Sequence, residues 1–156
     1  MSTQAHHVIA GADLRRALYR RYLRTPLKPP FMGNKTYHCV TVEWVDRVFA
    51  PYLKELQWSL NKDTWRQRGN QCEHFAMRTV MAAVDCLDVA AQQDESITAE
   101  SIAIGLLPYT QDRNGSGHAI VTWFIGGEFS EWEPQTQRWV TLSPAERASA
   151  YTPIFL

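Results

Sequence analysis

The spacing of apolar residues changes once along this chain, and that change restricts the folds open to it. Before about residue 90, apolar side chains recur every three or four positions, the spacing of an amphipathic helix. After residue 100 they form short runs bounded by turn residues, which is typical of strands. This order indicates an α+β fold, with N-terminal helices packed on a C-terminal antiparallel sheet.

Three helices are expected in the first part of the chain. The first covers residues 13–24. The second begins near Thr41 and contains Pro51, so it is expected to bend or to consist of two abutting helices. The third covers residues 72–90 and is apolar over much of its circumference, which predicts a central, buried position.

The strands are expected to form a meander. Apolar runs cover residues 101–107, 118–125 and 138–142, with residues 128–133 between the last two. Gly126–Gly127 is a two-residue hairpin signal, so the strands on either side of it should pair antiparallel.

The length of 156 residues suits one hydrophobic core, and we expect residues 1–156 to form a single domain. Residues 1–11 are interpreted as a flexible lead-in, and residues 12–64 as a helical N-terminal part. The formal net charge is zero, which argues against obligatory nucleic-acid binding. The odd number of cysteines, three, excludes a complete disulfide framework and favours a reducing compartment.

Cys72 lies where a turn after Gly69 is expected to become the third helix. The N–H groups at a helix start carry partial positive charge, which lowers the pKa of a thiol and can hold a developing oxyanion. Cys72 also shares a helical face with apolar residues and should point toward the sheet. A thiol in this position is a candidate nucleophile, with Glu73 slightly opposing thiolate formation.

The hairpin register places a base and an acid on one face of the sheet. Counting outward from the Gly126–Gly127 turn, His118 opposes Gln135, and Glu133 lies one diagonal step away. A carboxylate at that distance would orient the imidazole and stabilise its charged form. Gln135 is the alternative orienting residue, and Glu131 on the same face is a more distant third.

Two alternatives give these residues no role in nucleophilic catalysis: they could be core residues, or some of them could bind zinc. Taken singly, a cysteine is more often an inert core residue, and a strand histidine is more often a buried polar group with its hydrogen bonds made. A zinc site is conceivable, but its ligands lack the usual paired spacing. Those ligands would be Cys39, Cys72, His74 and Cys86. We therefore expect no metal and no cofactor.

Three segments resemble the transglutaminase-like group of the papain-like fold. They are Gly69–Ala76 (Gly-Asn-Gln-Cys-Glu-His-Phe-Ala), Gly117–Trp123 (Gly-His-Ala-Ile-Val-Thr-Trp) and Trp132–Thr136 (Trp-Glu-Pro-Gln-Thr). The pattern is also similar to small phage and prophage proteins of this fold. The resemblance covers about residues 65–143, and we interpret that stretch as a transglutaminase-like core.

The resemblance implies that Cys72 is the nucleophile, His118 the general base and Glu133 the orienting acid. Glutamate replaces the aspartate usual in this group, so the side chain that carries the acid is one methylene longer. Arg66 stands where papain-type enzymes place an oxyanion glutamine. The oxyanion donor therefore remains open among three candidates, Gln67, Gln71 and Trp65.

The expected function is thiol-dependent amide hydrolysis or acyl transfer on a peptide, a protein or a peptidoglycan-type amide. A second hypothesis is a catalytically inactive binding module for a peptide, glycan or partner protein, with a cleft lined by Trp65, Trp123 and Trp132. A third is an adaptor for nucleic acid or an acidic protein that uses the arginines of the first helix. These are Arg15, Arg16, Arg20, Arg21 and Arg24.

The N-terminal residues show no basic segment followed by an apolar run. We therefore expect no signal peptide, no membrane span and a cytoplasmic location. Release or delivery by a phage or a secretion apparatus is the alternative.

Overall fold

The computed structural model describes residues 7–22, 31–66, 70–151 and 153–156. Its helical elements are α1 (Gly11–Arg21), α2 (Val42–Trp44), the π-helix η1 (Val45–Phe49), α3 (Ala50–Ser59), α4 (Cys72–Gln93) and α5 (Pro144–Ala148). Its strands are β1 (His7–Ala10), β2 (Phe31–Met32), β3 (Thr36–Cys39), β4 (Ser101–Ile102), β5 (Ile104–Thr110), β6 (Gly117–Ile125), β7 (Glu128–Glu133), β8 (Arg138–Val140) and β9 (Ile154–Phe155). The fold is α+β, as predicted.

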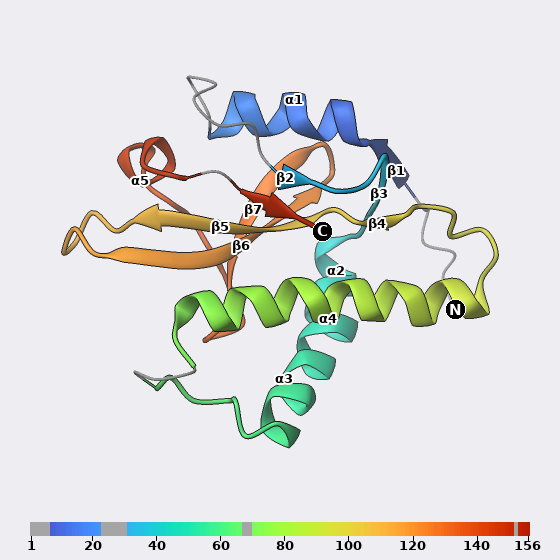
Figure 1. The fold of residues 1–156 in the computed structure, drawn as a ribbon, viewed down its shortest axis with the longest axis horizontal. Helices are drawn as coiled ribbons and strands as arrows, with labels where there is room; N and C mark the ends of the chain where they lie inside the picture. The colour runs from blue at the N-terminus through green and yellow to red at the C-terminus, as the bar shows by residue number, and fades with distance from the viewer. Residues whose placement is uncertain (1–6, 23–30, 67–69, 152) are drawn as a thin grey trace.

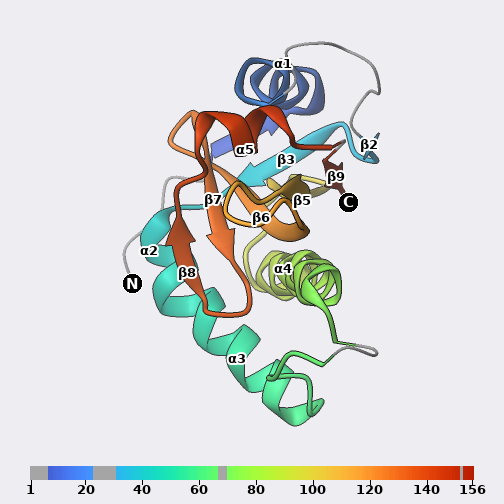
Figure 2. The same ribbon diagram turned by 90° about the vertical axis from the view of Figure 1, so that its left-hand side faces the viewer.

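The strands form two sheets. The larger has six strands in the order β2-β9-β5-β6-β7-β8, and its pairs are antiparallel except for β2 with β9. The smaller has three strands in the order β1-β3-β4. Helix α4 crosses one side of β5 and β6, and α1 lies on the opposite side (Figures 1 and 2). The sheet is therefore covered on both faces.

Strand β6 separates two apolar clusters because successive side chains of a strand point to opposite faces. Val121 and Trp123 pack with α4 and α3 residues in one cluster. Ile120 and Phe124 pack with α1 residues in the other. This arrangement fixes the face of the sheet on which each residue of β6 and β7 lies.

The hairpin between β6 and β7 has the predicted register. Ile125 pairs with Glu128, and Thr122 pairs with Glu131. Gly126 and Gly127 both have positive φ, 61° and 92°, which the tight turn needs and which glycine adopts without a Cβ clash. The register confirms that Glu131 and Glu133 share a face with His118.

The N-terminal region differs from the expectation. Residues 7–10 of the expected flexible lead-in form β1, which pairs with β3. The part expected to be helical, residues 12–64, also contains β2 and β3, because these short strands are stabilised by pairing with distant β9 and β4. The helix expected to bend or divide near Pro51 is divided into α2, η1 and α3, which follow one another directly, and Pro51 is the second residue of α3.

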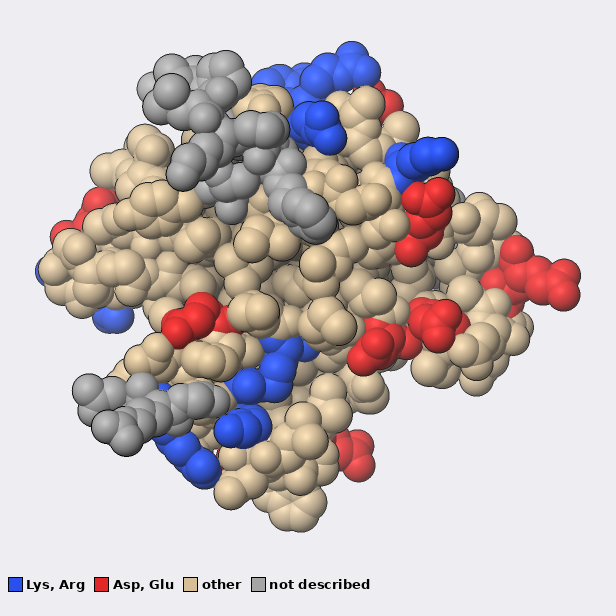
Figure 3. Space-filling model, viewed as in Figure 1, with Lys and Arg blue, Asp and Glu red and all other residues tan. Residues whose placement is uncertain are grey.

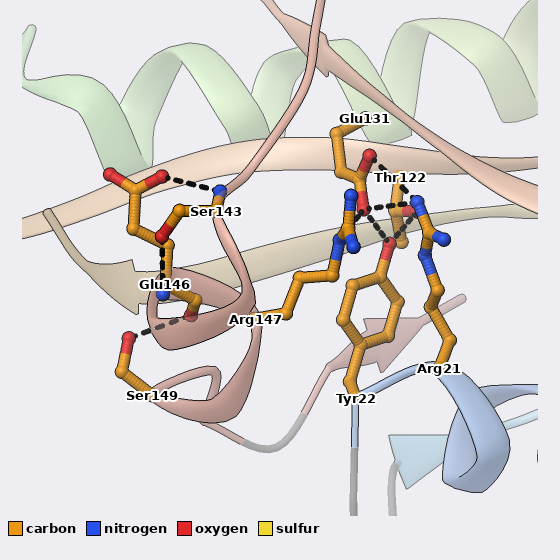
Figure 4. A network of polar contacts seen from close by, with 8 residues as sticks. All are labelled: Arg21, Tyr22, Thr122, Glu131, Ser143, Glu146, Arg147 and Ser149. Atoms are coloured by element: carbon orange, nitrogen blue, oxygen red, sulfur yellow. Dashed lines mark hydrogen bonds and ion pairs between the residues drawn. The ribbon is translucent and has the colours of Figure 1, made fainter. Parts of the chain in front are cut away.

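Glu131 lies in a buried polar cluster that joins α1, β6, β7 and α5 (Figure 4). Its carboxylate accepts hydrogen bonds from Arg21 Nη2 at 3.1 Å and from the Tyr22 hydroxyl at 2.9 Å. Arg147 Nε lies 3.6 Å from the same oxygen, and the Tyr22 hydroxyl also bonds to Thr122. Burial, together with the neighbouring Glu131 charge, raises the pKa of Tyr22 above its ordinary range. The cluster links elements far apart in the sequence.

Candidate functional site

Helix α4 begins at Cys72 and places its thiol against the start of β6. Cys72 is partly buried and packs against the core cluster that contains Ala119. The Ala119 backbone N–H donates a hydrogen bond to the Cys72 sulfur. Since Ala119 directly follows His118, the thiol lies beside the strand segment that carries the imidazole.

His118 and Glu133 form a close pair across the β6–β7 hairpin. His118 Nε2 lies 2.7 Å from Glu133 Oε2, and both side chains are 15% exposed. A carboxylate can only accept a hydrogen bond, so Nε2 carries the hydrogen and Nδ1 is left for proton exchange. The Gln135 backbone N–H donates to Glu133 Oε1 at 3.0 Å, which holds the carboxylate in place. Gln135 therefore supports Glu133 through its backbone.

Cys72 and His118 line the same open pocket, which has a volume of about 530 Å³. The other residues that line it come from the start of α4 and the segment before it, from the start of β6 and the loop before it, and from the turn after β7. They are Trp65, Gln71, Glu73, Gln111, Ser116, Gly117 and Gln135. A second hollow of about 370 Å³ is lined by both His118 and Glu133. The thiol and the imidazole are thus accessible from one cavity.

The electrostatics of the thiol differ from the expectation. Burial raises the pKa of Cys72 from its ordinary value, and the Glu73 carboxylate adds to this effect. The Cys72 sulfur donates a hydrogen bond to Glu73 Oε2 at 3.4 Å, which favours the neutral thiol. The Ala119 N–H has the opposite effect but does not outweigh burial. The helix start was expected to lower this pKa, whereas burial and Glu73 act in the opposite direction.

The tryptophans predicted to line a cleft separate into two groups. Trp65 is 56% exposed and lines the pocket. Trp123 and Trp132 are 0% exposed, so the prediction that they line a cleft is wrong. Their side chains point to the α4 and α3 side of the sheet, where Phe49 packs on both rings. Apolar packing explains their positions.

The structure describes two of the three residues predicted as oxyanion donors. Gln71 lines the pocket directly before Cys72, and Trp65 lines it from the preceding loop. Gln67 lies outside the described residues. Among the described residues, no three His, Cys, Asp or Glu side chains gather closely enough to hold a metal ion.

The sequence interpretation gave little weight to Glu73 and left out Gln111 and Ser116. Glu73 follows the nucleophile, and its position in the first turn was a usable signal. Gln111 and Ser116 belong to the loop before β6, which the backbone closes with a hydrogen bond from Gln111 N–H to Ser116 O at 2.9 Å. Only the folded loop shows that these residues line the pocket that also contains Cys72.

The arginines of α1 lie away from this pocket. Figure 3 shows basic side chains gathered over α1, and acidic side chains are scattered elsewhere on the same face. Arg15, Arg16 and Arg20 are exposed, whereas Arg21 turns inward to Glu131. Arg24 lies outside the described residues. Within the part of the chain described, no helix is long and apolar enough to cross a membrane.

Comparison with known proteins found a solved structure of similar fold, but no similar protein by sequence. No protein-family model matches the sequence, and no curated protein matches it. The solved structure of a "PSL1a-E64 complex" superposes with a TM-score of 0.66 at 18% sequence identity. The match covers 95% of this chain and 51% of the PSL1a chain, so this chain spans about half of that protein's length. At this identity the likeness shows a shared fold.

Proposed function

We propose that the chain is a thiol-dependent amide hydrolase or acyltransferase of the transglutaminase-like, papain-like type. Cys72 is the nucleophile, His118 the general base and Glu133 the orienting acid. The observation that carries the proposal is the 2.7 Å contact between His118 Nε2 and Glu133 Oε2, in a pair whose imidazole shares a pocket with Cys72. A chance pair of partly buried side chains would have no reason to border the pocket that Cys72 also lines.

The proposed reaction has two steps. The Cys72 sulfur attacks the amide carbonyl carbon, and His118 Nδ1 takes the thiol proton. The C–N bond breaks, and His118 returns that proton to the departing amine. Water or a second amine then attacks the thioester, loses a proton to His118 and releases the acid or the new amide together with the Cys72 thiol.

Glu133 orients the imidazole throughout these steps. A hydrogen bond at Nε2 keeps Nδ1 unprotonated at the start, as a base requires. When Nδ1 gains the proton, the carboxylate stabilises the resulting imidazolium. The first N–H groups of α4 are the expected oxyanion donors, because the helix begins at Cys72.

Acylation by 4-nitrophenyl acetate tests the proposal without knowledge of the substrate. The wild type is expected to release nitrophenolate in a burst and to gain one acetyl group at Cys72, detected by intact mass and peptide mapping. Cys72→Ser should lose the burst, and His118→Ala should slow it about 100-fold, because base catalysis contributes about 10²–10⁴. An equal burst rate in wild type and His118→Ala would overturn the proposal.

E64, the compound in complex with PSL1a, offers a second probe. The proposal predicts a mass adduct on the wild-type chain after incubation with E64. The adduct should be absent from Cys72→Ser and present in Cys86→Ser, a matched control at another partly buried thiol.

A catalytically inactive binding module is the second candidate. The raised pKa of Cys72 and its hydrogen bond to Glu73 favour it, because both hold the thiol in its unreactive form. A module of this kind would bind a peptide, glycan or partner protein in the pocket that Trp65 borders. It predicts that acetylation of Cys72 is no faster than that of a free thiol and that it does not depend on His118.

A further inference from the structure

Among the described residues that line the pocket of Cys72 and His118, one carries a negative charge and none is a lysine or arginine. The charged residue is Glu73, and its side chain is 45% exposed. A bound substrate therefore meets a carboxylate directly beside the nucleophile.

The neighbours of Glu73 do not neutralise this charge. His74 Nδ1 lies 3.6 Å from Glu73 Oε1, but the same nitrogen accepts a hydrogen bond from the Gln71 backbone N–H at 3.3 Å. A ring nitrogen that accepts a hydrogen bond has no hydrogen to donate, so the His74–Glu73 contact is not an ion pair. The Cys72 thiol is a weak, neutral donor to Glu73.

Trp65 gives the same pocket an exposed aromatic ring. Its side chain is 56% exposed, although it borders a cavity otherwise lined mainly by polar residues. An indole face attracts cations, and a carboxylate pairs with ammonium or guanidinium groups. A carboxylate and an indole that border one pocket are suited to an organic cation.

We propose that the substrate carries a Lys- or Arg-type cation next to the scissile amide, and that Glu73 and Trp65 bind this cation. The inference rests on the proposed function and names its substrate class. Binding would also activate the nucleophile, because a cation that pairs with Glu73 draws the carboxylate away from the Cys72 sulfur. The thiol proton is then released from Glu73 and can move to His118.

The test compares two pairs of probes that differ in one ammonium group. The first pair is the 4-nitrophenyl esters of N-acetyl-lysine and N-acetyl-norleucine, which place the cation on the acyl side. The second pair is lysinamide and norleucinamide as acceptors for the acetylated enzyme, which place it on the amine side. The readout is the lysine-to-norleucine rate ratio, with acylation located at Cys72 by mass.

In the wild type the ratio is expected to be about 10 in one of the two pairs, since one partly solvated charge contact accounts for about one power of ten. Glu73→Gln should bring that ratio close to 1. Trp65→Ala should lower it about two- to fivefold, the size of an exposed cation–π contact. Glu55→Gln removes an equal charge from the exposed surface of α3 and should leave the ratio unchanged.

The outcomes separate the two proposals. If the norleucine ester acylates Cys72 but neither ratio changes in Glu73→Gln, the cation inference is overturned and the proposed function stands. If neither ester nor 4-nitrophenyl acetate acylates Cys72, both are overturned. A ratio above 1 that survives Glu73→Gln and falls in Trp65→Ala also overturns the role given to Glu73.

Discussion

Glu131 and Glu133 lie two residues apart on β7 and on the same face, but they have different surroundings. Glu131 is 3% exposed and contacts Arg21, Arg147 and Tyr22. Glu133 contacts one imidazole and a backbone N–H, and it borders a hollow. Guanidinium groups of α1 and α5 lie beside the Glu131 carboxylate, whereas the Glu133 carboxylate pairs with the His118 imidazole. One sheet face thus holds a structural acid and a candidate catalytic acid.

The largest effect expected from this comparison is on stability. Glu131→Gln leaves Arg21 and Arg147 without their anionic partner and should lower the free energy of unfolding by about 3 kcal/mol. This value is at the low end of the range for breaking a buried ion pair, because both guanidinium groups are partly exposed. Urea denaturation measures it. If Glu131→Gln lowered the free energy of unfolding by less than Glu133→Gln does, the assignment of Glu131 as the structural acid would be contradicted.

Glu133→Gln should affect chemistry more than stability. The amide can no longer stabilise an imidazolium, so acylation of Cys72 by 4-nitrophenyl acetate should slow about 10- to 100-fold, less than for loss of the base itself. The denaturation midpoint should change little, because both side chains line an open hollow and are partly exposed. Acylation at the wild-type rate would mean that Glu133 has no catalytic role.

Tyr22→Phe tests the polar cluster around Glu131 without changing His118 or Glu133. It removes the hydroxyl that bonds to Glu131 and Thr122 and should destabilise the fold by about 1–2 kcal/mol. Acylation kinetics measured well below the unfolding transition should match the wild type. A catalytic defect in this folded variant would show that the two carboxylates are coupled.

The smallest expected effect concerns the pH dependence of alkylation by iodoacetamide. Burial and Glu73 raise the pKa of Cys72, so the thiolate should form, and the rate should rise, only above the ordinary thiol range. Glu73→Gln removes one cause and should move the rise to lower pH. Cys39, whose pKa burial raises to about 11, serves as the internal control and should stay unreactive near pH 8.

The sequence predicted those parts of the fold and site that depend on local signals. The Gly126–Gly127 turn defined the hairpin register, and the register placed Glu133 within reach of His118. The sequence did not predict that β1 and β3 would join β4, because such short strands form only by pairing with distant partners. The partners of Glu131 were missed for the same reason, since they come from α1 and α5.

The misplaced tryptophans have a different cause. Trp123 and Trp132 lie near the site in sequence, but alternation along β6 and β7 turns them to the α4 side of the sheet. The raised pKa of Cys72 was missed because burial and the rotamer of Glu73 cannot be read from a helix start.

A double-mutant cycle on His118 and Glu133, with Cys72 acylation by 4-nitrophenyl acetate as the readout, tests the account most directly. If Glu133 acts through the imidazole, His118→Ala and the double variant His118→Ala/Glu133→Gln should be acylated at the same rate, although Glu133→Gln alone is impaired. If the two losses multiply in the double variant, Glu133 acts independently of His118, and the proposed unit of Cys72, His118 and Glu133 is contradicted.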